Sequence, residues 1–487
     1  MDDYNDNLFD DELLDLVERF ERMIKEGSYM FFDADEFEEI IEYYLTIDEG
    51  NKAQHAIMFA LRQHPQNQDI LMLYVHYLYS INQLRKALSV LDEIEGLDPG
   101  NQDVLIMKGN IYSSKNKPEQ AIIEFKKALN NPGNCSEVHF FIAKEYRKME
   151  QFDTAIEHYK QSILNNSDED WALHDLWYCY NSTSQHSEAS EFFSQLTNIL
   201  PYSQTAWFYL GSAYNALNLY EKAIEAYDFA IAIADTYTDA YLAKAEVYSE
   251  MELYYEAIET YQKILLFEVP DAEINAKIGA NYQKLGNQAK AVEFFKKAVE
   301  LGESNYYYWY LLGDAYMQVE QYSLAEIHLN KARAINDMDL EVKYKLALLY
   351  QNTSNYVKAE NIYKKLIEFN FLTPPDVYLS YSELLLKQGR KKKAIKIIKH
   401  GLLFHGNEPS LTYRLAILMY QDGKRTEGLQ LFSAALGSNY EMHLEIFSYA
   451  PELLSHLEIL QLIEDLNPHR IKEQKRTEKP KKTRKRT

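Results

Sequence analysis

Alanine recurs at a fixed interval of 34 residues through most of this chain. Ten alanines keep this spacing without a slip, at Ala53, Ala87, Ala121, Ala155, Ala189, Ala223, Ala257, Ala291, Ala325 and Ala359. A tyrosine stands nine residues before most of them, at Tyr44 and then in every repeat from Tyr112 to Tyr350. A fixed period between 20 and 50 residues indicates a stack of identical supersecondary units. We therefore expect a repeat array rather than a set of separate globular domains.

Each repeat contains two apolar stripes with helical spacing. In residues 204–237 the stripes are Trp207, Leu210, Gly211, Tyr214 and Leu217, then Ala223, Ile224, Tyr227, Ala230 and Ile231. Spacings of three and four residues place these side chains on one face of each helix. Two short helices cannot enclose a core alone, so each pair needs the next pair to cover its apolar face.

These positions resemble the signature of the tetratricopeptide repeat (TPR) family. The matching residues are Trp207, Leu210, Gly211, Tyr214, Ala223, Tyr227 and Ala230 in one repeat, and Trp309, Leu312, Gly313, Tyr316, Ala325 and Ala332 in another. The resemblance covers residues 34–442 as about twelve repeats. Ten are in strict register, one is displaced by a residue at Pro374 and Pro375, and the last has Gly428 in the alanine slot. It implies an all-α fold, a right-handed α-solenoid whose first helices line a concave groove.

Small residues recur in the first helix of the repeats, as at Gly109, Gly211, Gly279 and Gly313. We interpret them as sites where this backbone approaches the alanine series of the second helix, so that a leucine at an alanine site would cost about 1–3 kcal/mol. Trp177 occupies the small-residue slot of its repeat. Either the helices separate there, or smaller neighbours compensate for the ring.

Three segments lie outside the predicted array. Residues 1–33 should form an acidic capping helix with the apolar stripe Leu13, Val17, Phe20 and Ile24. Residues 443–468 should form a C-terminal helical cap after Pro451, with the stripe Leu453, Leu454, Leu457, Leu460 and Ile463. Terminal repeats need caps of this kind. Residues 469–487 contain ten Lys or Arg, two Glu and one apolar residue, which predicts a disordered basic tail.

Charge is distributed unevenly along the sequence. The first 50 residues contain 18 acids and 3 bases, whereas residues 387–400 contain seven Lys or Arg and no acid. The net charge of the whole chain is −23. This asymmetry favours head-to-tail contacts, docking of the tail on acidic surface, or weak binding of a polyanion by the basic end. The residues predicted for an anionic partner are Lys391, Lys392, Lys393, Lys481 and Lys482.

The sequence argues against an enzyme and against membrane insertion. It contains no HExxH, CxxC or GxSxG pattern and no phosphate-binding loop. The two cysteines, Cys135 and Cys179, are too few for a disulfide framework and lack metal-ligand spacing. No apolar run reaches the length of about 18 residues that predicts a membrane span. We expect a cytoplasmic protein, because the acidic start of the sequence is unlike a signal peptide. Since these motifs are missing, we expect no cofactor or metal.

The TPR resemblance implies that ligands bind at positions 2, 5, 6, 9 and 12 of each first helix, counting the recurrent alanine as position 20. The carboxylate clamp of one TPR subfamily is absent, since Ile106, Trp171 and Asp175 stand where its polar and basic residues would be. The predicted peptide-binding residues are Trp171, His174, Tyr178, Phe208, Asp239, Glu246, Tyr307, Tyr310 and Tyr344. Aromatic side chains are favoured as anchors of protein interfaces. Alternatively, these aromatics reflect only the 40 tyrosines of the chain.

The resulting prediction is a non-catalytic scaffold or adaptor that binds partner proteins or peptides in the TPR groove. The alternative is an RNA- or ribosome-associated adaptor that uses the basic C-terminal end as an electrostatic footprint. The strongly acidic remainder of the chain argues against extended contact with nucleic acid.

Overall fold

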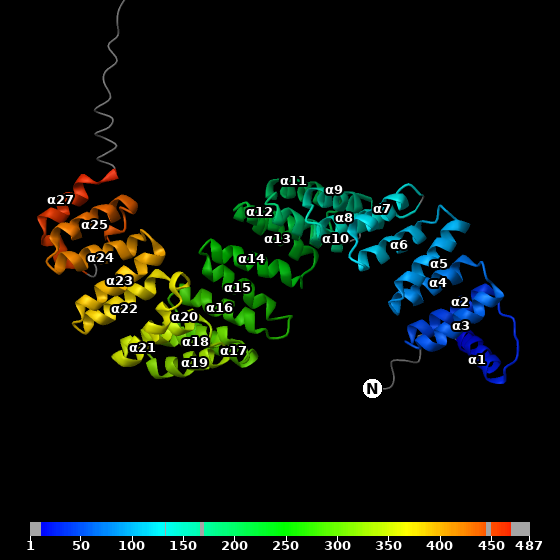
Figure 1. Cartoon of the computed structure of the whole chain (residues 1–487), viewed down its shortest axis with the longest axis horizontal. Helices are drawn as coiled ribbons and strands as arrows, with labels where there is room; N and C mark the ends of the chain where they lie inside the picture. Colours follow the sequence, from blue (N-terminus) through cyan, green and yellow to red (C-terminus); the bar gives the residue numbers. More distant parts are fainter. Residues whose placement is uncertain (1–10, 132, 166–169, 445–449, 469–487) are drawn as a thin grey trace, which may run out of the picture. The chain divides into compact units, whose positions relative to one another are not determined.

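A computed structural model describes residues 11–131, 133–165, 170–444 and 450–468, and it is helical throughout these ranges (Figure 1). The chain divides into two compact units, Met1–Val247 and Tyr248–Thr487, with the division inside one helix. Within each unit, short turns join successive helices into pairs. We call the first helix of a pair helix A and the second helix B. The predicted all-α array of helix-turn-helix repeats is confirmed.

Unit 1 begins with a single helix, which is followed by the helix pairs. Its helices are α1 (Asp11–Glu26), α2 (Ala34–Thr46), α3 (Gly50–Gln63), α4 (Gln68–Ser80), α5 (Leu84–Leu97), α6 (Gln102–Ser114), α7 (Pro118–Ala128), α8 (Cys135–Lys148), α9 (Phe152–Asn165), α10 (Asp170–Ser182), α11 (His186–Ile199), α12 (Gln204–Ala216), α13 (Tyr220–Ile233) and most of α14 (Thr238–Glu250).

The described residues of unit 2 form further pairs, followed by short helical segments. Its helices are α15 (Tyr254–Ile264), α16 (Ala272–Lys284), α17 (Gln288–Leu301), α18 (Tyr306–Gln318), α19 (Tyr322–Ile335), α20 (Leu340–Asn352), α21 (Tyr356–Ile367), the 3₁₀ turn η1 (Asn370–Leu372), α22 (Pro375–Lys387), α23 (Lys391–His405), α24 (Pro409–Gln421), α25 (Arg425–Ser438), the 3₁₀ turn η2 (Pro451–Ser455) and α27 (Leu457–Asp465).

The alanine series lies at the centre of every helix pair. All ten alanines, from Ala53 to Ala359, are fully buried. In the last repeat, Gly428 occupies the same slot and lies close to the backbone of helix A. A methyl group on Gly428 would lie 2.8 Å from the backbone nitrogen of Tyr420 and 2.9 Å from the carbonyl oxygen of Ala416. The slot therefore accepts only a very small side chain.

The glycines of helix A have the predicted role only in part. A methyl group on Gly279 would lie 2.7 Å from the Phe295 ring, and one on Gly313 would lie 2.7 Å from the Leu329 side chain. Each glycine thus makes room for a large side chain of its own helix B, four residues after the alanine site. The predicted approach of the two backbones is found at Gly313, where the same methyl group would lie 3.2 Å from the backbone nitrogen of Leu329, but at Gly279 the nearest atoms all belong to the Phe295 ring.

The turn between helix A and helix B repeats with the same 34-residue period. Residues with positive φ stand at Asp48, Asn82, Asn116, Glu150, Ser184, Asn218, Glu252, Gly286, Glu320 and Ser354. In one of these turns, Leu219 N donates to Tyr214 O at 2.9 Å, and Asn218 N donates to Asn215 O at 2.8 Å. These two bonds form a Schellman motif, which satisfies the last carbonyls of helix A. One left-handed residue therefore ends every helix A in register.

The repeat that contains Trp177 is packed differently from its neighbours in unit 1. Helices α10 and α11 pack less closely than the two helices of the pairs before and after them. The Trp177 ring lies 6.3 Å from the Tyr209 ring of α12 and 6.1 Å from the His186 ring, measured between centroids. Of the two alternatives for Trp177, separation of the helices is the one observed.

The N-terminal helix covers the first repeat with nearly the predicted face. Phe20 is fully buried, and its ring lies 5.9 Å from the Phe32 ring and 6.1 Å from the Phe37 ring. Val17 is also buried, but Ile24 is 42% exposed and Met23 is buried in its place. Leu13 packs partly buried against the same cluster. The predicted stripe is thus correct except at Ile24.

In the described residues 450–468, the C-terminal cap consists of two short segments rather than one helix. The segment after Pro451 is the 3₁₀ turn η2, and α27 starts only at Leu457. Leu453 is buried and Ile463 is partly buried as predicted. Leu454, Leu457 and Leu460 are exposed, because the change from 3₁₀ to α-helical geometry rotates the apolar face. The predicted stripe was wrong at these three residues.

The displaced repeat is present where the sequence places it. Helix α22 begins at Pro375, in a first turn that tolerates proline because its N–H groups have no partner within the helix. The left-handed residue of this repeat is Gly389, 35 residues after Ser354. The equivalent turn residue of the following repeat is Gly423, 34 residues later. One inserted residue thus shifts the register once, and the 34-residue period then resumes.

Candidate functional site

In unit 1, the predicted residues of α10 lie along one side of that helix. Trp171 and Tyr178 are 45% and 49% exposed, and the side chain of His174 is 69% exposed. The Trp171 ring packs edge-on against Phe140 of α8. The guanidinium of Arg147, also from α8, lies 5.5 Å from the centre of the Tyr178 ring. Helices A of adjacent repeats thus bring these aromatic side chains together with a cation.

Asp175 fixes the position of Arg147 beside this aromatic row. An Arg147 guanidinium nitrogen lies 3.0 Å from Asp175 Oδ1, and the Tyr159 hydroxyl donates to Asp175 Oδ2 at 3.0 Å. Sequence reasoning missed Phe140 and Arg147 as members of this surface. Both occupy groove positions of their repeat, position 5 and position 12, so the same rule of register would have found them.

Phe208 is less available than its position predicts. Its ring lies 5.8 Å from the Tyr227 ring of α13 and 5.5 Å from the Tyr237 ring in the following loop. It packs partly buried at the edge of the core cluster of unit 1. Phe208 therefore contributes part of one ring face and not a free anchor.

The three predicted tyrosines of unit 2 follow consecutive helices A. Tyr307 and Tyr310 of α18 have nearly parallel rings with centroids 5.9 Å apart, and Tyr307 is 48% exposed. The Tyr310 hydroxyl donates to Glu341 of α20 at 3.3 Å. Burial and the adjacent Glu341 carboxylate raise the pKa of Tyr310. The Tyr344 hydroxyl lies 2.9 Å from the Ser380 hydroxyl of α22. Tyr310 and Tyr344 thus connect repeats, and Tyr307 is the freest of the three.

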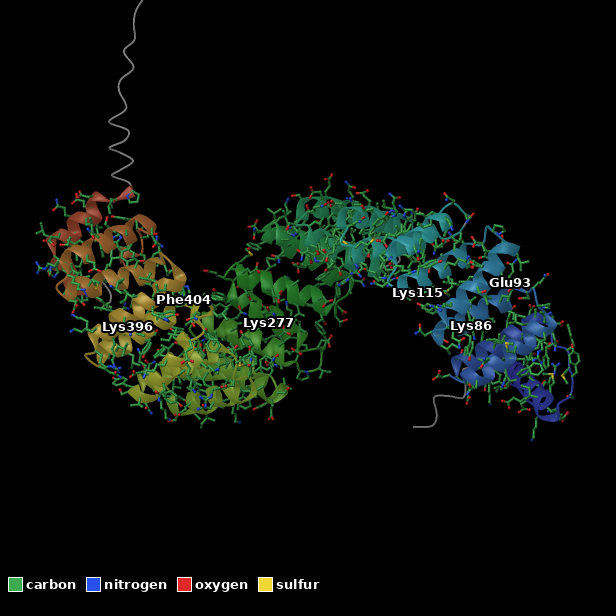
Figure 2. All side chains as sticks on the ribbon, viewed as in Figure 1. Lys86, Glu93, Lys115, Lys277, Lys396 and Phe404 are labelled. Carbon is green, nitrogen blue, oxygen red and sulfur yellow. The ribbon has the colours of Figure 1, made fainter. Side chains whose placement is uncertain are left out.

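A hollow lies beside Tyr307, between α16 and α18. Its volume is about 340 Å³, and its lining comprises Glu273, Ala276, Lys277, Ala280, Asn305, Tyr307, Tyr308 and Leu311. The lining from α16 is positions 2, 5, 6 and 9 of that repeat, the positions at which TPR ligands are expected. The two alanines leave space because their side chains are short. Figure 2 labels Lys277, whose ammonium lies 3.4 Å from a Glu273 carboxylate oxygen at the rim.

The two predicted acidic residues lie on α14. Asp239 and Glu246 are exposed on α14 and fall in unit 1. Glu273, on α16 of unit 2, is paired with Lys277.

The basic residues predicted for an anionic partner lie on α23. Lys392 and Lys393 are exposed, whereas Lys391 donates to the backbone carbonyl of Gln421 at 3.1 Å. Lys481 and Lys482 lie outside the described residues.

Two histidines of unit 1 form a partly buried pair. His139 Nδ1 and His158 Nδ1 lie 2.9 Å apart, and the Tyr146 ring stacks on His158 with centroids 5.7 Å apart. Burial lowers the pKa of His158 to about 4, and the positive charges of His139 and Lys126 act in the same direction. Two imidazoles do not make a metal site. In the described ranges, no three His, Cys, Asp or Glu side chains are grouped closely enough to hold a metal ion.

Cys179 is fully buried, and burial raises the pKa of its thiol to about 12, so that it is unreactive at neutral pH. None of the helices in the described ranges combines the length and the apolarity that a bilayer crossing requires.

Comparisons with known proteins agree with the repeat. A tetratricopeptide repeat family model matches residues 102–133, 136–169, 204–237, 238–267, 272–305 and 306–336. The gap at residues 170–203 is the repeat that carries Trp177 in the small-residue slot. No curated protein matches the sequence.

Two solved structures are similar along most of the chain. The crystal structure of yeast Tom70 is 14% identical, with 91% of this chain and 97% of that chain covered and a TM-score of 0.41. The crystal structure of the APC/C hetero-tetramer Cut9-Hcn1 is 11% identical, with 94% and 93% covered and a TM-score of 0.36. The six matched segments, together with the 34-residue period of alanines and turns, show that the chain contains tetratricopeptide repeats.

Proposed function

We propose that this chain is a non-catalytic cytoplasmic scaffold that binds partner proteins or peptides on the helix A face of its repeats. TPR repeats typically mediate protein–protein interactions, and the family is generally non-catalytic. The observation that carries the proposal is the hollow between α16 and α18. Its volume of about 340 Å³ lies within the range of about 300–1,000 Å³ that is usual for ligand pockets.

The lining of this hollow favours an apolar side chain with a polar neighbour. Tyr307 and Leu311 offer apolar walls, and the alanines of α16 leave room between them. The Glu273 side chain is 68% exposed, so it remains accessible to a basic residue of the ligand despite its pairing with Lys277. A peptide with an apolar or aromatic anchor and a nearby Lys or Arg fits this arrangement.

The aromatic row of unit 1 supports a second contact of the same kind. Trp171 and Tyr178 are about half exposed, and Arg147 is held over the Tyr178 ring. Exposed aromatic side chains that are fixed by their neighbours lose little conformational entropy on binding. His174 and Phe208 belong to this proposed surface as peripheral residues.

A panning experiment with a peptide library tests the proposal. The full chain should enrich peptides that contain an apolar or aromatic anchor. Ala280→Leu fills the hollow without removing a polar group, and it should weaken binding of the enriched peptides at least about tenfold, or about 1.4 kcal/mol. Ala289→Leu is the matched control, because Ala289 is exposed on α17 of the same repeat. Equal binding by both variants, or no enrichment at all, would refute this subsite.

A further inference from the structure

Helix α23 carries a row of cations that continues into an apolar end. Lys392, Lys396, Lys399 and Leu403 are separated by four, three and four residues, and all four are exposed. Residues with these separations lie on one face of a helix. The row spans about 16 Å from Lys392 to Leu403, at a rise of 1.5 Å per residue. It belongs to helix B of its repeat and is therefore separate from the helix A face.

Several of these cations have no carboxylate to pair with. Arg390 is held by both carboxylate oxygens of Glu360, at 2.6 and 2.9 Å. Lys399 lies 3.8 Å from Glu427. Among the residues that the structure describes, Lys392, Lys393 and Lys396 have no ion-pair partner. The whole chain has a net charge of −23, so this group of unpaired lysines is a local region of the opposite sign.

The 3₁₀ turn η1, which also has exposed apolar side chains, lies at the same end of α23 as Leu403. The His405 ring nitrogen Nε2 lies 2.9 Å from the backbone oxygen of Thr373, which holds the end of α23 beside the 3₁₀ turn. Phe371 and Leu372 of η1 are 72% and 62% exposed, and Leu403 is 78% exposed. Figure 2 labels Lys396 and Phe404, which both belong to α23. We call Lys392, Lys393, Lys396, Leu403, Phe371 and Leu372 the basic–apolar surface.

We propose that the basic–apolar surface binds residues 1–10 of a second copy of this chain. That segment, MDDYNDNLFD, contains four aspartates and no Lys or Arg, together with Tyr4, Leu8 and Phe9. Its acids match the unpaired lysines in charge, and its apolar residues match the exposed end of the surface. Ten residues span at most about 35 Å when extended, which exceeds the length of the row on α23.

The composition of the surface favours this occupant over other anionic partners. RNA would pair with the lysines through its phosphates and could stack a base on Phe371, but it offers no aliphatic group to cover Leu372 and Leu403. A short acidic segment with apolar anchors satisfies both halves of the surface.

Such a contact joins two different surfaces and is therefore heterologous. Heterologous contacts produce closed rings when the rotation between copies closes, and open chains of molecules when it does not. The association should weaken as ionic strength rises, since the lysines are exposed to solvent.

Sedimentation velocity over a concentration series of the full-length protein tests the proposal. We expect concentration-dependent association that weakens at least tenfold in Lys392→Glu/Lys396→Glu and in Leu403→Ser. The matched controls are Lys284→Glu, at an exposed lysine of α16, and Val357→Ser, at a side chain that is 74% exposed on α21. Both controls should associate like the original protein.

A charge exchange makes the test specific for the segment. Asp3→Lys/Asp6→Lys should weaken association by itself and should restore it when combined with Lys392→Glu/Lys396→Glu. A synthetic peptide of residues 1–10 should compete, whereas a scrambled peptide of the same composition should compete less. Deletion of residues 469–487 should leave the association in place.

The proposal is overturned if the protein stays monomeric, if the tail deletion abolishes association, or if the charge exchange fails to restore it. Because none of these variants touches the hollow, their failure leaves the proposed function unaffected.

Discussion

At the scale of single residues, the left-handed turn positions give the array a measurable strain. Glu320 has φ 58° and Gly286 has φ 75° at equivalent turns of neighbouring repeats. A left-handed conformation costs a residue other than glycine about 1–2 kcal/mol. Glu320→Gly should therefore raise the free energy of unfolding by up to about 1 kcal/mol, and Gly286→Ala should lower it by about 1 kcal/mol or more. Urea unfolding of both variants measures the two changes in the free energy of unfolding. A change of the same sign in both variants would contradict the argument.

The histidine pair predicts acid sensitivity of unit 1. The folded pKa of His158 is lowered to about 4 from an ordinary value of 6.5. Between these values the unfolded chain binds the proton more tightly than the folded chain, so stability should fall as the pH falls from 6.5 towards 4. His158→Gln should flatten this decline. His55→Gln, at an exposed histidine of α3, is the control. Melting temperatures measured from pH 7 to pH 4.5 compare the three proteins, and parallel curves would rule the pair out as the cause.

At the scale of helices, packing within a repeat predicts where damage appears. A leucine at Gly279 would overlap the Phe295 ring, because even a methyl group there would lie only 2.7 Å from it. Overpacking of this kind costs about 1–3 kcal/mol. In a repeat array each repeat contacts only its neighbours, so the loss of stability should be confined to the altered repeat and the repeats beside it. Hydrogen exchange in Gly279→Leu should therefore rise first in α16 and α17, with Ala289→Leu as the control. A uniform rise along the chain would contradict this expectation.

At the scale of the whole molecule, the sequence predicts repeated features much better than single ones. The alanine period identifies the helix pairs directly, because one packing constraint recurs in every repeat. The turn residues also recur, but glutamate, serine and aspartate at a left-handed position carry no recognisable signal. The caps occur once each, so nothing averages out an error of register, and Ile24 and Leu457 were assigned to the wrong face.

The same distinction applies to the candidate site. The register rule selects Tyr307, which lines the hollow, but the space itself depends on Ala276 and Ala280. Small side chains have no distinctive chemistry, so a search for anchors and charges passes over them. Phe208 was selected by position, yet its burial depends on Tyr237 in the next loop, a contact that no pattern within a helix reveals.

The loose packing of α10 against α11 has a mechanical consequence. Repeats joined end to end carry the same tension when unit 1 is pulled, so the pair with the fewest interlocking side chains should yield at the lowest force. Trp177 sets that weak point, because its ring occupies the slot where other repeats interlock. Optical tweezers attached at residues 35 and 236 should record a first extension the length of one repeat. The variant Trp177→Gly should still fold, and its first extension should occur at a different force. If the first extension maps to another repeat, packing density does not set the order of rupture.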